Sequence, residues 1–294
     1  MVSGAAVALG TVSALGAGVS CISCSGSRDA DGAGVNLVRV ISGRNTEDFD
    51  PFLMLDAFDS SDPSDYVKGF PWHPHRGIET VTYLISGDIE HSDSIGNSGR
   101  ITDGGCQWMT AGSGILHQEM PLPAERMLGY QLWLNLPRSH KMAEPKYFDI
   151  TEDMIPKIES EDALVRIIGG TFDHFEGKVQ GSYIKADLLD ISVAPNGTLS
   201  FETDFEKNVF VYLFEGSARF GDTEKPVLEK TAALMSHGDQ LTVHAGESGV
   251  RFAYFAGTPL KEPVAWGGPI VMNTREELDT AFSELQDGTF IKHR

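Results

Sequence analysis

Two short segments of the chain place metal-ligand side chains two residues apart. The first pair is His73 and His75, and the second is His117 and Glu119. On a β-strand, residues i and i+2 point to the same face, so each pair would present its two side chains together. Imidazole nitrogens with one carboxylate suit a divalent first-row metal and leave coordination positions open. The pairs therefore predict a metal site, against the alternative of four polar side chains on a solvent-facing sheet.

The surroundings of these pairs distinguish them from the chance matches that short motifs often produce. His75 leads directly into the apolar run Ile78–Ile85, and His117 lies inside the apolar run Ile115–Met120. A further H-x-E match, His174–Glu176, follows a turn-like stretch instead. We interpret that match as a surface loop.

Short strands without intervening helices must position the ligand pairs. Runs rich in β-branched and aromatic residues alternate with clusters of Gly, Asp, Asn, Ser and Pro, which is typical of an antiparallel sandwich or barrel. The strands expected in the first half are Val35–Ile41, Phe52–Phe58, Ile78–Ile85, Cys106–Ala111, Ile115–Met120 and Met127–Leu136. Those expected in the second half are Leu164–Ile168, Asp187–Val193, Val209–Phe214, Ala232–Met235, Gln240–His244 and Val250–Ala256. The two sets follow a similar plan, which indicates a duplicated β-barrel.

Two other segments have a clear pattern. Residues 137–161 are polar and punctuated by proline, so we expect a linker with one helical turn. Near the C-terminus, Thr274 and Glu277 form a capping box, an apolar stripe with helical spacing follows, and Gly288 marks a stop. We expect this short helix to lie across a barrel or against the first domain.

Composition excludes several classes of function. The 294 residues include 23 Lys and Arg against 42 Asp and Glu, a formal net charge of −19 that opposes direct binding to nucleic acid or to an anionic membrane surface. Three cysteines cannot form a disulfide framework, which favours a reducing compartment. No apolar run is long enough to span a bilayer. We expect a cytoplasmic protein.

The first residues differ in composition from the rest of the chain. Met1–Gly26 contains no charged side chain and is dominated by Gly, Ala, Ser and Val. It lacks the basic region and strong apolar core of a secretory signal and the arginines of a transit peptide, so organelle targeting is not expected. Such a composition does not bury a core, and we expect residues 1–31 to be a disordered or cleaved leader. Cys21 and Cys24 have redox spacing, which leaves a redox pair as the alternative.

Long motifs surround both ligand pairs. Residues 69–81 have the sequence GFPWHPHRGIETV, and residues 107–120 have QWMTAGSGILHQEM. Both resemble the signature segments of the pirin family of bicupins. Residues 50–56, DPFLMLD, resemble that family's early segment, and residues 267–287 resemble its C-terminal end. The resemblance extends from about Gly32 to the end of the chain.

The resemblance implies an all-β fold with two cupin-type antiparallel β-barrels and a short C-terminal helix. It implies a metal-binding N-terminal cupin over residues 32–140, a linker over 141–163 and a metal-free C-terminal cupin over 164–294. The second half contains no paired ligand motif, in agreement with a metal-free barrel. We interpret His237 and His244 as structural or exposed side chains.

The resemblance also implies a function. An Fe²⁺ site, with Ni, Cu or Mn as alternatives, would be built from His73, His75, His117 and Glu119. Glu119 would in addition be the catalytic residue that moves a proton from a bound hydroxyl. The implied activity is that of a quercetin 2,3-dioxygenase, which acts on O2 and a flavonol-like aromatic. The alternative is an iron-dependent transcriptional coregulator or redox-sensing protein that binds a transcription factor without turnover. The resemblance thereby also implies the nucleus as the other candidate location. A monomer is expected.

Four neighbouring residues have predicted roles. Arg76 is expected to point away from the ligand face, where it would orient a ligand, bind an anion or pair with Glu79 or another acid. Trp108 is expected in the core and Cys106 as a buried, inert thiol. Gln131 is expected to donate a hydrogen bond into the cavity.

Overall fold

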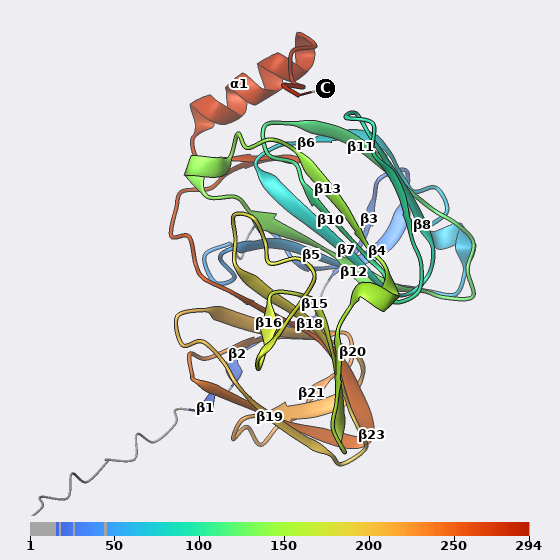
Figure 1. The fold of residues 1–294 in the computed structure, drawn as a ribbon, viewed down its shortest axis with the longest axis vertical. Helices are drawn as coiled ribbons and strands as arrows, with labels where there is room; N and C mark the ends of the chain where they lie inside the picture. Colours follow the sequence, from blue (N-terminus) through green and yellow to red (C-terminus); the bar gives the residue numbers. More distant parts are fainter. Residues whose placement is uncertain (1–15, 18, 26, 44–45, 294) are drawn as a thin grey trace, which may run out of the picture.

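The structure is a computed structural model of the chain and describes residues 16–17, 19–25, 27–43 and 46–293. Figure 1 shows two β-domains stacked along the long axis, with one helix at the end of the N-terminal domain that lies away from the C-terminal domain. The larger sheets pair their strands antiparallel, apart from one short parallel pairing near residue 16. The prediction of an all-β fold with a short C-terminal helix is confirmed.

The N-terminal domain packs a seven-stranded sheet against a four-stranded sheet. In spatial order the larger sheet contains β13 (Lys146–Ile150), β10 (Cys106–Thr110), β7 (Ile78–Ser86), β12 (Met127–Asn135), β5 (Phe52–Ser60), β4 (Val35–Ile41) and β3 (Ser27–Asp31). The smaller sheet contains β6 (Phe70–His75), β11 (Ile115–Pro121), β8 (Ile89–Asp93) and β9 (Ser98–Ile101). A short 3₁₀ helix, Pro63–Asp65, precedes β6. Both ligand pairs therefore lie in the smaller sheet.

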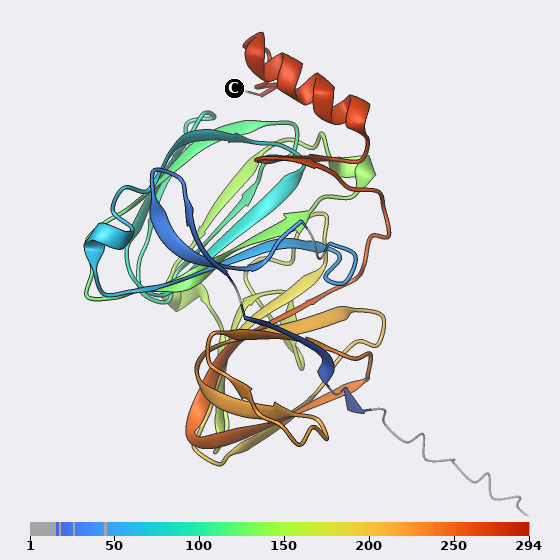
Figure 2. The same ribbon diagram turned by 180° about the vertical axis from the view of Figure 1, so that it is seen from behind.

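The C-terminal domain is one ten-stranded sheet that curls round on itself in Figure 2. Its main path is β14 (Lys157–Glu159), β15 (Ala163–Gly169), β18 (Ala186–Val193), β23 (Gln240–Gly257), β20 (Asn208–Phe220), β22 (Thr231–Met235) and β2 (Val19–Ser25). Three short strands join this path: β1 (Gly16–Ala17), β19 (Thr198–Glu202) and β21 (Val227–Leu228). Two separate hairpins are β16 (Thr171–Phe172) with β17 (Phe175–Glu176), and β24 (Ala265–Gly267) with β25 (Ile270–Met272). The curl is possible because β20 and β23 are long and their pairing contains register shifts.

Each predicted strand coincides with an observed one to within about two residues at its ends, with two exceptions. The strand expected at Val209–Phe214 is longer and continues to Phe220 in β20. The strands expected at Gln240–His244 and Val250–Ala256 are one continuous strand, β23. The Gly-containing stretch between them was expected to be a turn. In the pairing with β20, Gly216 lies opposite Val250 and Ala218 lies opposite Ala245, so residues 246–249 form a bulge that bends the strand without ending it.

The domain boundaries differ from the predicted ones in two places. β13 lies inside the predicted linker 141–163, but it pairs with β10 as an edge strand of the N-terminal sheet. The rest of that stretch includes 3₁₀ turns at Arg138–His140 and Glu152–Met154. In the predicted C-terminal cupin 164–294, the last segment, 265–293, packs on the N-terminal domain, where its apolar side chains cluster with Leu116. An amphipathic helix needs an apolar surface to cover, and the N-terminal domain provides it.

The predicted disordered leader is not observed over the described part of residues 16–31. β2 pairs with the edge strand β22, and β3 pairs with β4. The physical reason is that strand pairing is made by backbone groups, so an edge strand can take up a segment of small residues without large apolar side chains. Residues 1–15, 18 and 26, and the side chains of Cys21 and Cys24, lie outside what the structure describes.

The two domains share one hydrophobic core. Phe52 of β5 packs edge-on against Phe210 of β20 and Phe255 of β23, at ring-centroid distances of 5.2 and 6.2 Å. At the same interface Tyr83 donates a hydrogen bond of 2.8 Å to Asp190, which also pairs with Arg251. The N-terminal sheet that backs the ligand strands is therefore held by apolar packing and by a buried polar cluster.

The C-terminal helix α1 (Arg275–Gln286) begins at the predicted capping box. The Thr274 side chain accepts a hydrogen bond from the Glu277 amide at 3.2 Å, and the Glu277 carboxylate accepts one from the Thr274 amide at 3.0 Å. The helix has 12 residues, and within the described ranges no helix is long and apolar enough to cross a membrane.

We predict that Thr274→Ala destabilises the docked helix by about 1 kcal/mol, because the first-turn amide loses its acceptor. The matched control is Thr280→Ala on the exposed side of the same helix, where the hydroxyl donates only to the Glu276 carbonyl. Urea unfolding of both variants measures the difference. Equal stability of the two variants would contradict a role for the cap.

Candidate metal centre

Adjacent strands bring the three histidines together. β6 and β11 pair antiparallel, so that His117 lies opposite His73, and Ile115 lies opposite His75. One ring nitrogen from each of His73, His75 and His117 lies within 4.8 Å of the others. Their ring centroids are 4.3 to 4.9 Å apart. The three predicted histidines thus form one cluster that could hold a metal ion.

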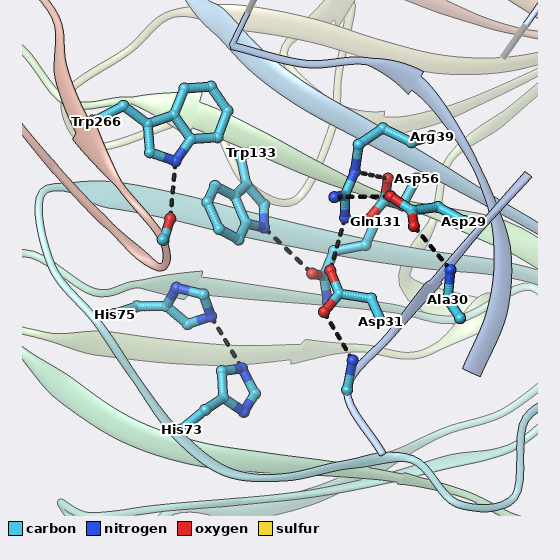
Figure 3. Close-up of polar contacts among 12 residues, drawn as sticks. Asp29, Ala30, Asp31, Arg39, Asp56, His73, His75, Gln131, Trp133 and Trp266 are labelled. Atoms are coloured by element: carbon cyan, nitrogen blue, oxygen red, sulfur yellow. Dashed lines mark hydrogen bonds and ion pairs between the residues drawn. The ribbon is translucent and has the colours of Figure 1, made fainter. Parts of the chain in front are cut away.

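The hydrogen bonds of two rings fix their tautomers. His73 Nδ1 lies 2.8 Å from the Pro71 carbonyl oxygen, and His75 Nδ1 lies 3.1 Å from the Pro269 carbonyl oxygen. A carbonyl oxygen can only accept, so both Nδ1 atoms carry a proton. The two Nε2 atoms, 3.0 Å apart, then face each other with lone pairs in the neutral rings (Figure 3). A cation between them resolves that repulsion, and backbone carbonyls at the outer nitrogens are the usual support of metal-bound histidines.

His117 is the most deeply buried member of the cluster. Its side chain is fully buried, and neither ring nitrogen has a hydrogen-bond partner. Burial, together with the neighbouring His75 and His73, keeps the pKa of His117 well below its usual value. Burial, followed by the charge of His73, lowers the pKa of His75 to about 3. Both rings are therefore neutral near pH 7, the state that a metal ligand requires.

Glu119 lies two residues after His117 on β11 and is also buried. Thr82 and Gln107 donate hydrogen bonds to Oε1, the first of them over 3.1 Å, and Gln131 donates to Oε2 over 2.7 Å. Three donors from the larger sheet therefore hold the carboxylate beneath the smaller one. The histidine cluster does not include Glu119 as a close member. Its assignment as the fourth ligand stays a prediction.

His91 was not singled out from the sequence, yet it borders the cluster. It lies on β8, where it pairs in register with Glu119, and its buried ring is 5.3 Å from that of His117. The ring stacks on Tyr147 at 4.1 Å and contacts the Asp93 carboxylate at 3.4 Å. The H-x-D spacing of His91 and Asp93 was the available signal, but the segment is too polar to suggest a buried strand.

A cavity of about 550 Å³ opens on the cluster, a size typical of a small-molecule site. Its aromatic side includes Trp133, which contacts the His75 ring edge-on at 5.0 Å, and Trp266, whose ring is 5.8 Å from that of Trp133. Its lining residues come from distant segments: Asp31, Gly32, Ala33, Arg39, Met54, Asp56, Phe70, Pro71, His73, His75, Gln131, Trp133, Trp266, Gly268 and Pro269. Figure 3 shows several of them around one space, with the two tryptophans above the histidines.

An ion-pair network forms another wall of the cavity. Arg39 donates to both carboxylate oxygens of Asp56, at 2.9 and 2.8 Å, and to Asp31 at 2.7 Å. Asp29 lies at the edge of the network, 3.4 Å from the guanidinium. Burial raises the pKa of Asp56 to about 6, although the paired Arg39 opposes that rise. The cavity therefore has one cation, Arg39, and two carboxyl groups, Asp31 and Asp56, along this wall, while Asp29 pairs with Arg39 from outside the lining.

The predicted neighbours of the ligands have the following places. Arg76 is buried and points away from the cluster, but its acidic partner is Glu284, at 2.7 Å, rather than Glu79. Trp108 lies in the core, and Cys106 is buried, which raises the pKa of its thiol. Gln131 lines the cavity as expected and links Glu119 to the indole of Trp133.

The histidines outside the cluster do not form a second site. His237 and the segment His174–Glu176 are exposed. His244 is half-buried and contacts the Thr198 hydroxyl at 3.2 Å. Within the described ranges the search for grouped ligands finds the single cluster.

The buried histidines make the stability of the metal-free protein depend on pH. In the unfolded chain His75 takes up a proton near 6.5, whereas in the folded state it stays neutral to about 3. Between these values the unfolded state binds more protons. The contribution of His75 to the free energy of unfolding therefore decreases as the pH falls below 6.5, by up to about 1.4 kcal/mol for each pH unit.

We predict that the stability advantage of the wild type over His75→Gln narrows as the pH of the metal-free protein falls from 7 to 5. Comparison with the variant is needed because Asp56, whose pKa is raised to about 6, favours the folded state in acid and contributes with the opposite sign. Urea unfolding at a series of pH values measures the difference. An advantage that stays constant would show that His75 is not held neutral in the fold.

Comparison with known proteins agrees with this geometry. A family model described as pirin matches residues 34–134, and one described as the pirin C-terminal cupin domain matches residues 188–291. A pirin-like protein of Caulobacter vibrioides is 42% identical, covering 90% of this chain and 96% of that protein. Human pirin is 36% identical, covering 88% of this chain and 89% of its own length.

Two further similar proteins have names that refer to an activity. A Pseudomonas aeruginosa protein, provisionally named a quercetin 2,3-dioxygenase, is 43% identical over 88% of this chain and 93% of its own. The crystal structure of a quercetin 2,3-dioxygenase from Acinetobacter baumannii superimposes with a TM-score of 0.81 and 31% identity, covering 94% of this chain and 97% of that one. The predicted pair of cupin-type domains is confirmed by these matches. From its sequence and its fold alike, the chain belongs to the pirin family of cupin proteins.

Proposed function

We propose that the protein is a metal-dependent dioxygenase that opens a flavonol-type aromatic ring with O2. The observation that carries the proposal is the clustering of three imidazoles, with ring nitrogens within 4.8 Å of one another, beside an aromatic-walled cavity. Such a cluster fits a divalent metal and leaves positions for other ligands. The provisional name of the Pseudomonas relative and the name of the Acinetobacter structure support the choice of substrate and co-substrate.

The proposed ligands are His73, His75, His117 and Glu119, with Fe²⁺ as the metal and Ni, Cu or Mn as alternatives. A bound metal of this kind would supply Lewis acidity and a place for O2 and substrate oxygens. A carboxylate has two oxygens and about four lone-pair sites, so Glu119 can accept its three hydrogen bonds and still serve as ligand or base. Those hydrogen bonds keep its side chain in one orientation.

The chain's own residues can hold a flat substrate and move one proton. Trp133 and Trp266 provide broad apolar faces for an aromatic ring, and Met54 and Phe70 complete that surface. A hydroxyl of the substrate placed near the cluster would lose its proton to Glu119, the catalytic residue of the proposal. Gln131, which contacts both Glu119 and Trp133, orients the carboxylate relative to the bound ring.

The alternative function is regulation without turnover. In that case the same metal site would control binding to a transcription factor, in the cytoplasm or the nucleus. With a net charge of −19, such a role would depend on protein contacts rather than on nucleic acid. The monomeric state expected from the sequence also stays a prediction.

The ligand assignment predicts the metal content. Purified protein should contain about one metal ion per chain, because one cluster of this type is described. His117→Ala should remove stoichiometric metal, since it deletes the buried central ligand, whereas His237→Ala on the exposed surface should keep it. Elemental analysis after gel filtration measures both. Full retention of metal by His117→Ala would refute the site.

The catalytic assignment predicts turnover. Metal-loaded protein should consume O2 with a flavonol such as quercetin, and a chelator should stop it. Glu119→Gln should lower the rate by about 100-fold or more, because the proton acceptor is lost. Glu125→Gln, at an exposed glutamate nearby in the chain, is the matched control. The measurements are an oxygen electrode and flavonol absorbance.

Two results would contradict this second prediction. A Glu119→Gln variant as fast as the control would remove Glu119 from the reaction. Fully metallated wild type that consumes no O2 across a panel of flavonols would refute the dioxygenase and favour the regulatory alternative.

A further inference from the structure

The C-terminal segment, residues 265–293, packs on the N-terminal domain and contacts the proposed metal ligand His75. The carbonyl oxygen of Pro269, in the turn between β24 and β25, lies 3.1 Å from His75 Nδ1, across 194 residues of sequence. That contact determines which nitrogen of His75 carries the proton and which faces the cluster. Figures 1 and 2 show this hairpin and α1 beside the ligand sheet, away from the C-terminal barrel. The tautomer of His75 therefore depends on a segment outside the N-terminal barrel.

A buried arginine next to His75 fastens the same segment. The Arg76 side chain is 2% exposed and donates hydrogen bonds of 2.8 Å to the carbonyls of Ser113 and Phe290. It also pairs with Glu284 of α1 at 2.7 Å and lies 4.1 Å over the Phe290 ring. Most of its contacts are thus to the C-terminal segment. A buried guanidinium with an ion pair and satisfied donors is costly to undock, since its charge would lose its partners.

The backbones of the two segments are also joined. The Val271 amide donates to the Arg76 carbonyl over 3.0 Å. Gly77 has φ of +78°, and a Cβ there would lie 1.9 Å from the Val271 carbonyl oxygen, so only glycine permits this approach. Lys141 donates to the carbonyls of both Gly77 and Val271, over 2.7 and 2.9 Å. The end of the ligand strand is therefore built on the C-terminal hairpin.

We propose that residues 265–293 form a clasp that positions His75, so that metal affinity and docking of the C-terminal helix are thermodynamically linked. The proposal rests on the metal site of the proposed function and adds Arg76, Glu284 and Pro269 as positioning residues. Groups that orient a histidine ligand typically change metal affinity about 10- to 100-fold when they are lost. Linkage requires reciprocity: if docking strengthens metal binding, metal binding strengthens docking by the same factor.

The clasp can be loosened from its far end without touching a ligand. Glu284→Gln removes the charge that pairs with Arg76, and Asp279→Asn makes the same chemical change on the exposed part of the helix, where Asp279 pairs only with Arg275 at 2.9 Å. Co²⁺ is the probe, titrated in competition with a chelating dye. We expect Glu284→Gln to weaken Co²⁺ binding by about 3- to 10-fold. This effect is smaller than that of losing a group in direct contact with a ligand, because Glu284 contacts Arg76 and not His75. Asp279→Asn should bind as the wild type does.

A second measurement separates a coupled clasp from simple packing. Hydrogen exchange of residues 270–293 is compared with and without Co²⁺, in the wild type and in Phe290→Ala, which loses the ring over Arg76. Metal should slow exchange of the Val271 amide in the wild type, and Phe290→Ala should both speed exchange and weaken Co²⁺ binding. A purely structural helix would show faster exchange in the variant with no effect of metal.

The possible failures can be told apart. If the wild type binds Co²⁺ tightly and both clasp variants bind it equally well, the clasp is refuted while the metal site stands. If Co²⁺ leaves exchange in residues 270–293 unchanged, the linkage is refuted in the same way. If the wild type binds no Co²⁺, the metal site of the proposed function and the clasp fall together.

Discussion

The architecture of this protein centres on three imidazoles that face one another, two of them, His75 and His117, buried and one, His73, half-buried at the cavity. A buried ring resists protonation, as the lowered pKa values of His75 and His117 show. Two of the rings have their protons directed outward by backbone carbonyls. The inward-facing nitrogen atoms of these two rings then present lone pairs to each other with no proton between them. A cation bound between the rings stabilises this arrangement. The strand pairing, the cavity and the C-terminal contact all maintain this convergence.

The clustering of the three histidines depends on both sheets of the N-terminal domain and on the C-terminal domain. β7 is buried on both faces, and its consecutive residues serve two different purposes. Thr82 donates to Glu119 beneath the ligand strands, and Tyr83 points the other way to Asp190 of the C-terminal domain. A strand that is pinned on both faces has little freedom to move. The C-terminal domain, in whose described residues no ligand cluster is found, thus supports the ligand face from behind.

The sequence predicts what depends on local pattern and misses what depends on distant contacts. A spacing of two residues beside or within apolar runs identified His73, His75 and His117, because a strand puts such residues on one face. His91 was missed since its strand is polar, and polar strands lack the periodic apolar signal. β2 was missed because its pairing with β22 is made by backbone groups, which composition does not report. The partner of Arg76 was not identifiable either, because Glu284 is far away in sequence and only the fold brings it near.

Both ends of the chain help to enclose the cavity above the histidines. Asp31, Gly32 and Ala33 come from the N-terminal hairpin, and Trp266, Gly268 and Pro269 come from the C-terminal hairpin. The cavity wall formed by the N-terminal hairpin and its neighbours is acidic: Arg39 balances only one of the two aspartates that line it, Asp31 and Asp56, which disfavours an anionic guest. The wall that includes the C-terminal hairpin is aromatic, and its Pro269 carbonyl oxygen also determines the tautomer of His75. The N-terminal end of the chain therefore contributes to selection of the guest, whereas the C-terminal end contributes both to the cavity wall and to the orientation of the proposed ligand His75.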